Sequence, residues 1–187
     1  MKRTVLIFGL IAGAIMSLEM IVGLPFIDEI GSLGLVVGYT TMVVAFLMVY
    51  FGIRSYRDRV AGGSISFGRA FSVGILITIV ACLCYVATWE VIFYKFHPDF
   101  FDKYAARVVA ETKASGATAE QVEVKRREMA IQGEQYRKPL VNIAYTFIEP
   151  FPVGLLFTLV CAGILRKRRP RDADRASAGA PAQQVNP

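Results

Sequence analysis

Three glutamates, Glu19, Glu90 and Glu149, lie within or at the edge of long apolar stretches. A carboxylate near the centre of a bilayer costs about 2.5–3.5 kcal/mol unless it faces protein, water or a partner. Counted along helices that rise 1.5 Å per residue, all three fall within about 9 Å of the same face of the membrane. One interpretation is an acidic cluster that binds a cation or exchanges protons. The other, which we favour, is that each carboxylate lies near the interface, meets headgroup water or pairs with Lys95 or Arg137, and fixes a helix end.

The other reactive side chains exclude most alternative chemistry. The chain has one histidine, His97, so a site with two or three imidazoles from this chain is excluded, and with it most zinc and non-haem iron chemistry. The three cysteines lie inside apolar stretches, as small packing residues do: Cys82, Cys84 and Cys161. Residues 62–69 are rich in glycine but lack the Gly-Lys-Ser/Thr ending of a phosphate-binding loop. We expect a tight turn there, and we expect no catalytic residue, cofactor or metal.

Composition identifies the elements that must carry these glutamates. Hydrophobic residues make up 55% of the chain and charged residues only 19%, and the mean hydropathy is +0.47. The apolar residues form four stretches, at about 4–24, 33–53, 70–93 and 143–165. Each is about 20 residues long, which as a helix matches the hydrocarbon thickness of about 30 Å. Lipid offers no partner for free backbone groups, so the sequence predicts an all-α integral membrane protein with four transmembrane helices.

Positive charges predict the orientation of these helices. Twelve Lys and Arg residues flank the stretches on one side: Lys2, Arg3, Arg54, Arg57, Arg59, Arg69, Arg166, Lys167, Arg168, Arg169, Arg171 and Arg175. The link at 25–32 has Asp28 and Glu29 and no positive charge. Positively charged links stay in the cytoplasm, so both chain ends are predicted to be cytoplasmic. Residues 95–142 hold nine Lys and Arg against seven Asp and Glu, and four crossings place them outside.

The first apolar stretch has two features of its own. A basic start followed by an apolar run also opens a secretory signal peptide, but this run continues to Leu24, longer than a signal core, so we predict an uncleaved helix. Gly9, Gly13 and Ser17 recur at four-residue spacing, which leaves one helix face flat enough for close packing. That face meets either the fourth helix of the same chain or a second subunit; we favour packing within the chain.

The external segment, about 96–139, is predicted to form a helical hairpin. Helices are predicted at 99–113 and 119–137, with Gly116 as a left-handed cap and Thr118 with Gln121 as a capping box. We interpret the hairpin as a cap over the bundle, with a partner-binding surface as the alternative. The chain then divides into a transmembrane domain at 1–169 and a disordered cytoplasmic tail at 170–187, where apolar periodicity is absent.

Prolines interrupt the fourth stretch at Pro150 and Pro152, directly after Glu149. Proline removes a backbone hydrogen bond and kinks or unwinds a helix. Such breaks line substrate sites in transporters. Since we find one broken helix and no internal repeat, we interpret the break as the entry of the fourth helix.

Four motifs occur in a characteristic order: residues 63–71, 97–100, 149–154 and the basic stop at 164–168. In this order they resemble the bacterial membrane proteins of domain-of-unknown-function family 4199, over roughly residues 4–169. The resemblance implies a four-helix inner-membrane protein. It implies no activity.

Three functions remain open. The leading hypothesis is a non-catalytic structural or accessory protein of the bacterial inner membrane, whose partners are the lipid bilayer and another membrane protein or a second copy, and not nucleic acid. The second is a small transporter or cation-responsive channel that uses Glu19, Glu90 and Glu149, as an oligomer because four helices leave little room for a pore. The third, a membrane enzyme with the same carboxylates as acid and base, has the least support.

Overall fold

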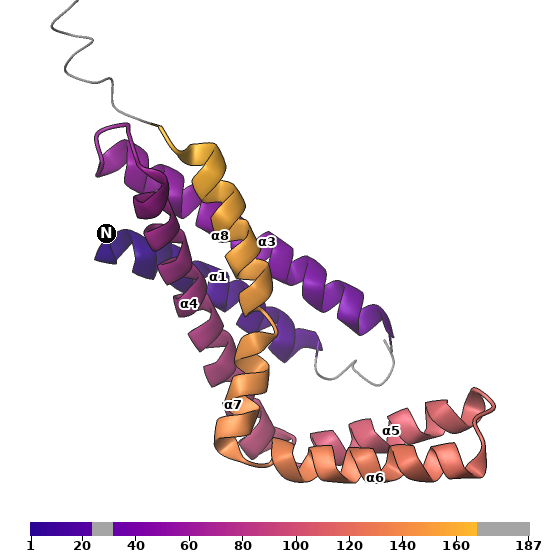
Figure 1. The fold of residues 1–187 in the computed structure, drawn as a ribbon. Helices are drawn as coiled ribbons and strands as arrows, with labels where there is room; N and C mark the ends of the chain where they lie inside the picture. The colour runs from indigo at the N-terminus through magenta and orange to yellow at the C-terminus, as the bar shows by residue number, and fades with distance from the viewer. Residues whose placement is uncertain (24–31, 168–187) are drawn as a thin grey trace, which may run out of the picture.

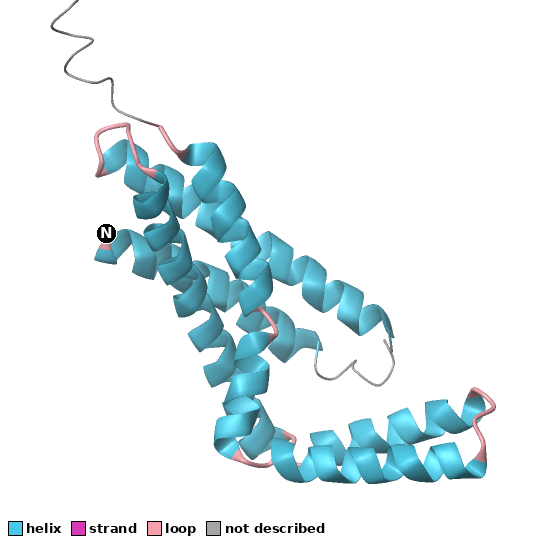
Figure 2. Ribbon diagram, in the orientation of Figure 1, coloured by secondary structure: helices cyan, strands magenta, loops and turns pink. Residues whose placement is uncertain are grey.

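The computed structural model describes residues 1–23 and 32–167. Helices account for every regular element in these ranges, and their order is α1 (Lys2–Gly23), α3 (Ser32–Arg59), α4 (Phe67–Val91), the π-helix η2 (Ile92–Phe96), α5 (Phe100–Ala114), α6 (Ala119–Tyr136), α7 (Pro139–Ile148) and α8 (Phe151–Leu165). Figure 2 shows the same helices joined by short loops. The predicted tail at 170–187 and all of the predicted 25–32 link except Ser32 lie outside the described residues.

Four spans are long and apolar enough to cross a membrane: Lys2–Gly23, Val36–Arg59, Phe67–Phe96 and Pro139–Leu165. The predicted all-α fold with four transmembrane helices is therefore confirmed. The second span continues past the predicted end at 53 to Arg59, because arginine side chains at a helix end can reach water while the backbone stays hydrogen-bonded. The fourth begins at Pro139 and not at 143, because proline is well suited to the first helical position.

Helix α4 is the central element of the bundle. It packs against α1, α3 and α8, and half of its most apolar window is buried, more than in any other span among the described residues. Figure 1 shows α1, α3, α4 and α8 as the bundle. Side chains that face outward are large and apolar, such as Leu18, Leu83 and Leu156, with exposed fractions of 63%, 56% and 61%. An apolar exterior is the surface that lipid requires.

Small residues allow α1 to approach α4 closely. A Cβ atom added at Gly13 would lie 2.5 Å from the Cβ atom of Cys84, and one added at Gly9 would lie 2.7 Å from Val80. One turn further, the hydroxyl oxygens of Ser17 and Thr88 are 2.8 Å apart in a hydrogen bond. The face formed by Gly9, Gly13 and Ser17 thus packs within the chain, on the third span and not on the fourth.

Helices α5 and α6 form an antiparallel pair, which we name the arm (residues 100–136). Arg137, directly after the arm, donates to both carboxylate oxygens of Asp102 at 2.8 Å. The predicted capping box of Thr118 and Gln121 is present, and Gly116 adopts a φ of 84°. Figure 1 shows the arm extending sideways from the end of the bundle opposite the N-terminus.

The N-terminus, the α3–α4 link and the end of α8 gather at the other end of the bundle (Figure 1). Ile65 in the link and Lys167 after α8 exchange two backbone hydrogen bonds of 2.9 Å, which tie these segments together. Both described chain ends therefore lie on the side of the bundle away from the arm, as four crossings require.

The fourth span is broken in its interior. Helix α7 ends at Ile148 and α8 begins at Phe151, so the break at Glu149 and Pro150 lies ten residues after Pro139. We predicted the break near the start of this helix, six residues in. The break is deeper because α7 begins four residues earlier than the apolar pattern indicated.

Candidate functional site

A groove of about 570 Å³ opens between the arm and the neighbouring ends of the bundle. Six helices contribute to it, namely α1, α3, α4, α5, α6 and α7. Seven aromatic side chains line it: Tyr39, Tyr85, Trp89, Phe100, Tyr104, Tyr136 and Tyr145. We name it the arm-side groove.

Helical spacing places these rings on the groove. Tyr85 and Trp89 are four residues apart on α4, and Phe100 and Tyr104 are four residues apart on α5, so each pair shares one helix face. The rings of Trp89 and Phe100 pack edge to face with centroids 4.9 Å apart, which connects α4 to the arm. The sequence alone does not predict this cluster, because its aromatic residues come from segments far apart in the chain.

Two of the three predicted glutamates line the arm-side groove, Glu19 from α1 and Glu149 from the α7–α8 break. The hydroxyl of Tyr85 donates to a carboxylate oxygen of Glu149 at 3.1 Å, and Glu149 remains exposed toward the groove. Within residues 1–23 and 32–167 neither carboxylate forms an ion pair. The groove therefore presents two carboxylates without an ion-pair partner among the described residues, although one arginine, Arg107, also lines it.

Glu90 does not line the arm-side groove, although it follows Trp89 directly. Its Oε1 atom is buried and has no hydrogen-bond partner among the described residues. Arg137, one of the two cations predicted as partners for these glutamates, instead pairs with Asp102. The structure thus brings Glu19 and Glu149 to one groove and leaves Glu90 outside it. In the described ranges no three His, Cys, Asp or Glu side chains come together as a metal site would need.

Two residues of the arm modify the outer part of the groove. Arg107 lies over the ring of Tyr104, 5.8 Å from its centroid, and is within 4.0 Å of Glu111, so its charge is partly matched on α5 itself. Tyr136 is largely enclosed, and this burial raises the pKa of its hydroxyl to about 12. Its phenol therefore stays neutral at physiological pH and can donate a hydrogen bond into the groove.

This arrangement matches one class of ligand. Aromatic faces attract ammonium groups, with about 0.5–2 kcal/mol per contact depending on how far water is excluded. Carboxylates in the same groove add direct charge attraction, which is stronger away from bulk water. A ligand with an ammonium group fits both the aromatic rings and the two carboxylates.

Comparison with known protein families gives a match over most of the chain. The sequence model of the family described as "Protein of unknown function (DUF4199)" matches residues 7–167. No curated protein and no solved structure shows significant similarity to the chain.

Proposed function

The chain belongs to the DUF4199 family of unknown function, and we propose that it is a non-catalytic accessory protein of the bacterial inner membrane that binds an ammonium-bearing ligand in the arm-side groove. One observation carries the proposal: Glu19 and Glu149 lie in the same groove as seven aromatic rings. The alternative is that each carboxylate lies near the membrane interface and fixes a helix end. That alternative does not require aromatic side chains around the carboxylates.

The distribution of charge supports an external groove. Lys2, Arg3, Arg54 and Arg59 lie toward the end of the bundle away from the arm. By the positive-inside rule that end is cytoplasmic, and the arm-side groove opens on the outer face. A ligand from outside the cell would then reach the groove without crossing the hydrocarbon layer.

The arm is suited to contact a partner. Its two helices pack mainly on each other and extend sideways from the end of the bundle (Figure 1). Val124 and Ile131 of α6 have exposed fractions of 52% and 62%. We infer another membrane protein or a second copy of the chain as the partner, and not nucleic acid. Native mass spectrometry of the protein extracted gently from its own membrane tests this, because a bare monomer would contradict it.

The test of ligand binding uses the single tryptophan of the chain, Trp89, which lines the groove. We expect choline to change Trp89 emission of the purified protein in maltoside micelles. The uncharged isostere 3,3-dimethylbutan-1-ol should bind at least tenfold more weakly, which corresponds to about 1.4 kcal/mol. Equal binding of the two compounds would show that charge is not recognised.

Substitutions then assign the recognition to particular carboxylates. Glu19→Gln and Glu149→Gln should each weaken choline binding about tenfold, because each removes one negative charge from the groove. Glu90→Gln is the matched control, since it removes the same charge one residue from Trp89 but outside the groove. If Glu90→Gln weakened binding as much as the other two, the proposed site would be wrong.

Transport of the same cation is the second candidate function. The observation that favours it is the break at Glu149 and Pro150 inside the fourth span, because interrupted helices line the substrate sites of transporters. Liposomes that contain the purified protein should then take up choline faster than empty liposomes. Uptake should fall in Glu149→Gln and persist in Glu90→Gln. No uptake above that of empty liposomes would leave binding alone as the function.

A further inference from the structure

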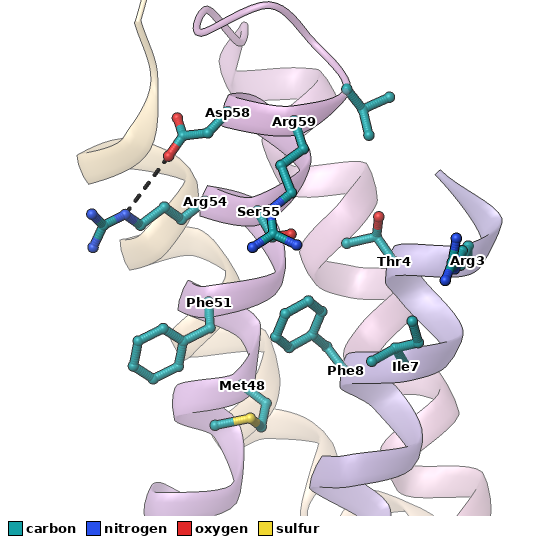
Figure 3. A pocket seen from close by; sticks show the side chains of 11 residues that line it. Arg3, Thr4, Ile7, Phe8, Met48, Phe51, Arg54, Ser55, Asp58 and Arg59 are labelled. Atoms are coloured by element: carbon teal, nitrogen blue, oxygen red, sulfur yellow. Dashed lines mark ion pairs between the residues drawn. The ribbon is translucent and has the colours of Figure 1, made fainter.

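A second groove lies at the opposite end of the bundle, between α1 and the last turns of α3. Its volume is about 830 Å³. Three arginines, Arg3, Arg54 and Arg59, surround its outer part, and Phe8, Met48 and Phe51 line the part nearer the bundle centre. Figure 3 shows Arg59 and Phe8 in the space between the two helices. The groove thus has a positively charged part at the helix ends and an apolar wall nearer the bundle centre.

The charges of this groove are not balanced. Its single carboxylate, Asp58, is 2.7 Å from Arg57, which does not line the groove, and 3.7 Å from Arg54. Arg3 and Arg59 form no ion pair with any residue in the described part of the chain. Two guanidinium groups from facing helices therefore line one groove without an acidic partner among the described residues (Figure 3). The groove also lies at the N-terminus of α1, where the helix dipole favours negative charge.

The apolar wall of the groove favours a lipid over a soluble anion as the ligand. Phe51 and Ile7 keep exposed fractions of 45% and 44% on the outside of the bundle. The wall is therefore continuous with the surface that faces hydrocarbon. An anionic phospholipid has both matching parts: its phosphate suits the arginines, and its acyl chain suits the apolar wall.

We propose that this groove binds one anionic phospholipid, with its phosphate between Arg3 and Arg59 and an acyl chain against Phe8, Met48 and Phe51. Guanidinium groups bind phosphate through paired N–H donors, a geometry that lysine cannot provide. The lipid joins α1 to α3 at the end of the bundle where both helices enter the headgroup layer. The site is independent of the arm-side groove and of the ligand proposed there.

Native mass spectrometry with added lipid tests the proposal. The purified protein in maltoside micelles is titrated with phosphatidylglycerol and, separately, with phosphatidylcholine of the same acyl chains. We expect one phosphatidylglycerol to be retained at least tenfold more tightly than phosphatidylcholine. Equal retention of the two lipids would overturn the proposal, and so would displacement by millimolar glycerol 3-phosphate, which would indicate a site for a soluble anion.

Two double variants separate the groove from general surface charge. Arg3→Gln with Arg59→Gln should weaken phosphatidylglycerol binding at least tenfold. Arg69→Gln with Arg166→Gln removes the same charge at the same end of the bundle, outside the groove, and should leave binding unchanged. Equal losses in both would refute a defined site.

A measurement on the unmodified protein keeps the test valid if a variant fails to fold. A phosphatidylglycerol with a photoreactive group in its acyl chain should crosslink to peptides that contain Phe8, Met48 or Phe51. Crosslinks spread evenly over the lipid-facing surface of all four spans would contradict the proposal.

Discussion

Replacing Gly13 by alanine should force α1 and α4 apart. The added Cβ atom would lie 2.5 Å from the Cβ atom and 2.9 Å from the Sγ atom of Cys84, whereas ordinary contacts lie at 3.4–4 Å. The helices must therefore separate by about 1 Å, and overpacking of this kind costs about 1–3 kcal/mol. Alanine also gains about 1 kcal/mol over glycine in helix propensity.

Gly163→Ala isolates the packing contribution. A Cβ atom at Gly163 meets no atom within 4 Å, so this variant receives the propensity gain without the steric cost. The free energy of unfolding should therefore be lower in Gly13→Ala than in Gly163→Ala by about 1–3 kcal/mol. Titration of maltoside micelles with SDS, followed by the emission of Trp89, measures both values.

A compensating substitution identifies the atoms responsible. Cys84→Gly removes the Cβ and Sγ atoms that the new methyl group meets, so Gly13→Ala should be less harmful in that background. The expected coupling energy is at least about 0.5 kcal/mol, the scale for residues in direct contact. If Gly13→Ala and Gly163→Ala had the same stability, or if Cys84→Gly gave no compensation, α1 would not pack on α4 through this face.

Three further predictions concern other contacts. Thr158→Val removes a hydroxyl 3.1 Å from that of Thr78 in the buried α4–α8 contact; the free energy of unfolding should fall by about 0.6 kcal/mol, and an unchanged value would show that this bond adds nothing. Arg137→Gln breaks the pair with Asp102, whose side chains are 57% and 61% exposed. Since exposed pairs contribute at most about 1 kcal/mol, amide exchange in the arm should accelerate while the SDS midpoint of the bundle stays constant; a lowered midpoint would contradict this. The raised pKa of Tyr136, about 12, means that the folded state keeps a phenol proton that the unfolded state loses near pH 10. Stability should therefore be constant below pH 10 and fall between about pH 10 and pH 12, and the fall should be shallower in Tyr136→Phe; identical profiles would refute the assignment.

Local patterns determined much of the fold. Four apolar stretches of about bilayer length fix the number of spans, because a helix that leaves lipid early would expose backbone groups to hydrocarbon. The capping box at Thr118 and the left-handed Gly116 were also predictable, since both depend on residues within one turn. The four-residue spacing of Gly9 and Gly13 also predicted a closely packed helix face. It did not predict which helix packs against that face.

The grouping of the glutamates was decided only by the tertiary structure. Residue counts along the helices gave the depths of Glu19, Glu90 and Glu149, but depth does not give the direction in which a side chain points. Neighbouring residues on a helix point about 100° apart, so Trp89 lines the arm-side groove while Glu90 does not. The rotation of each helix follows from which faces pack in the bundle. The sequence thus determined how far each carboxylate lies along its helix, and the packing of six helices determined which two carboxylates meet the aromatic rings.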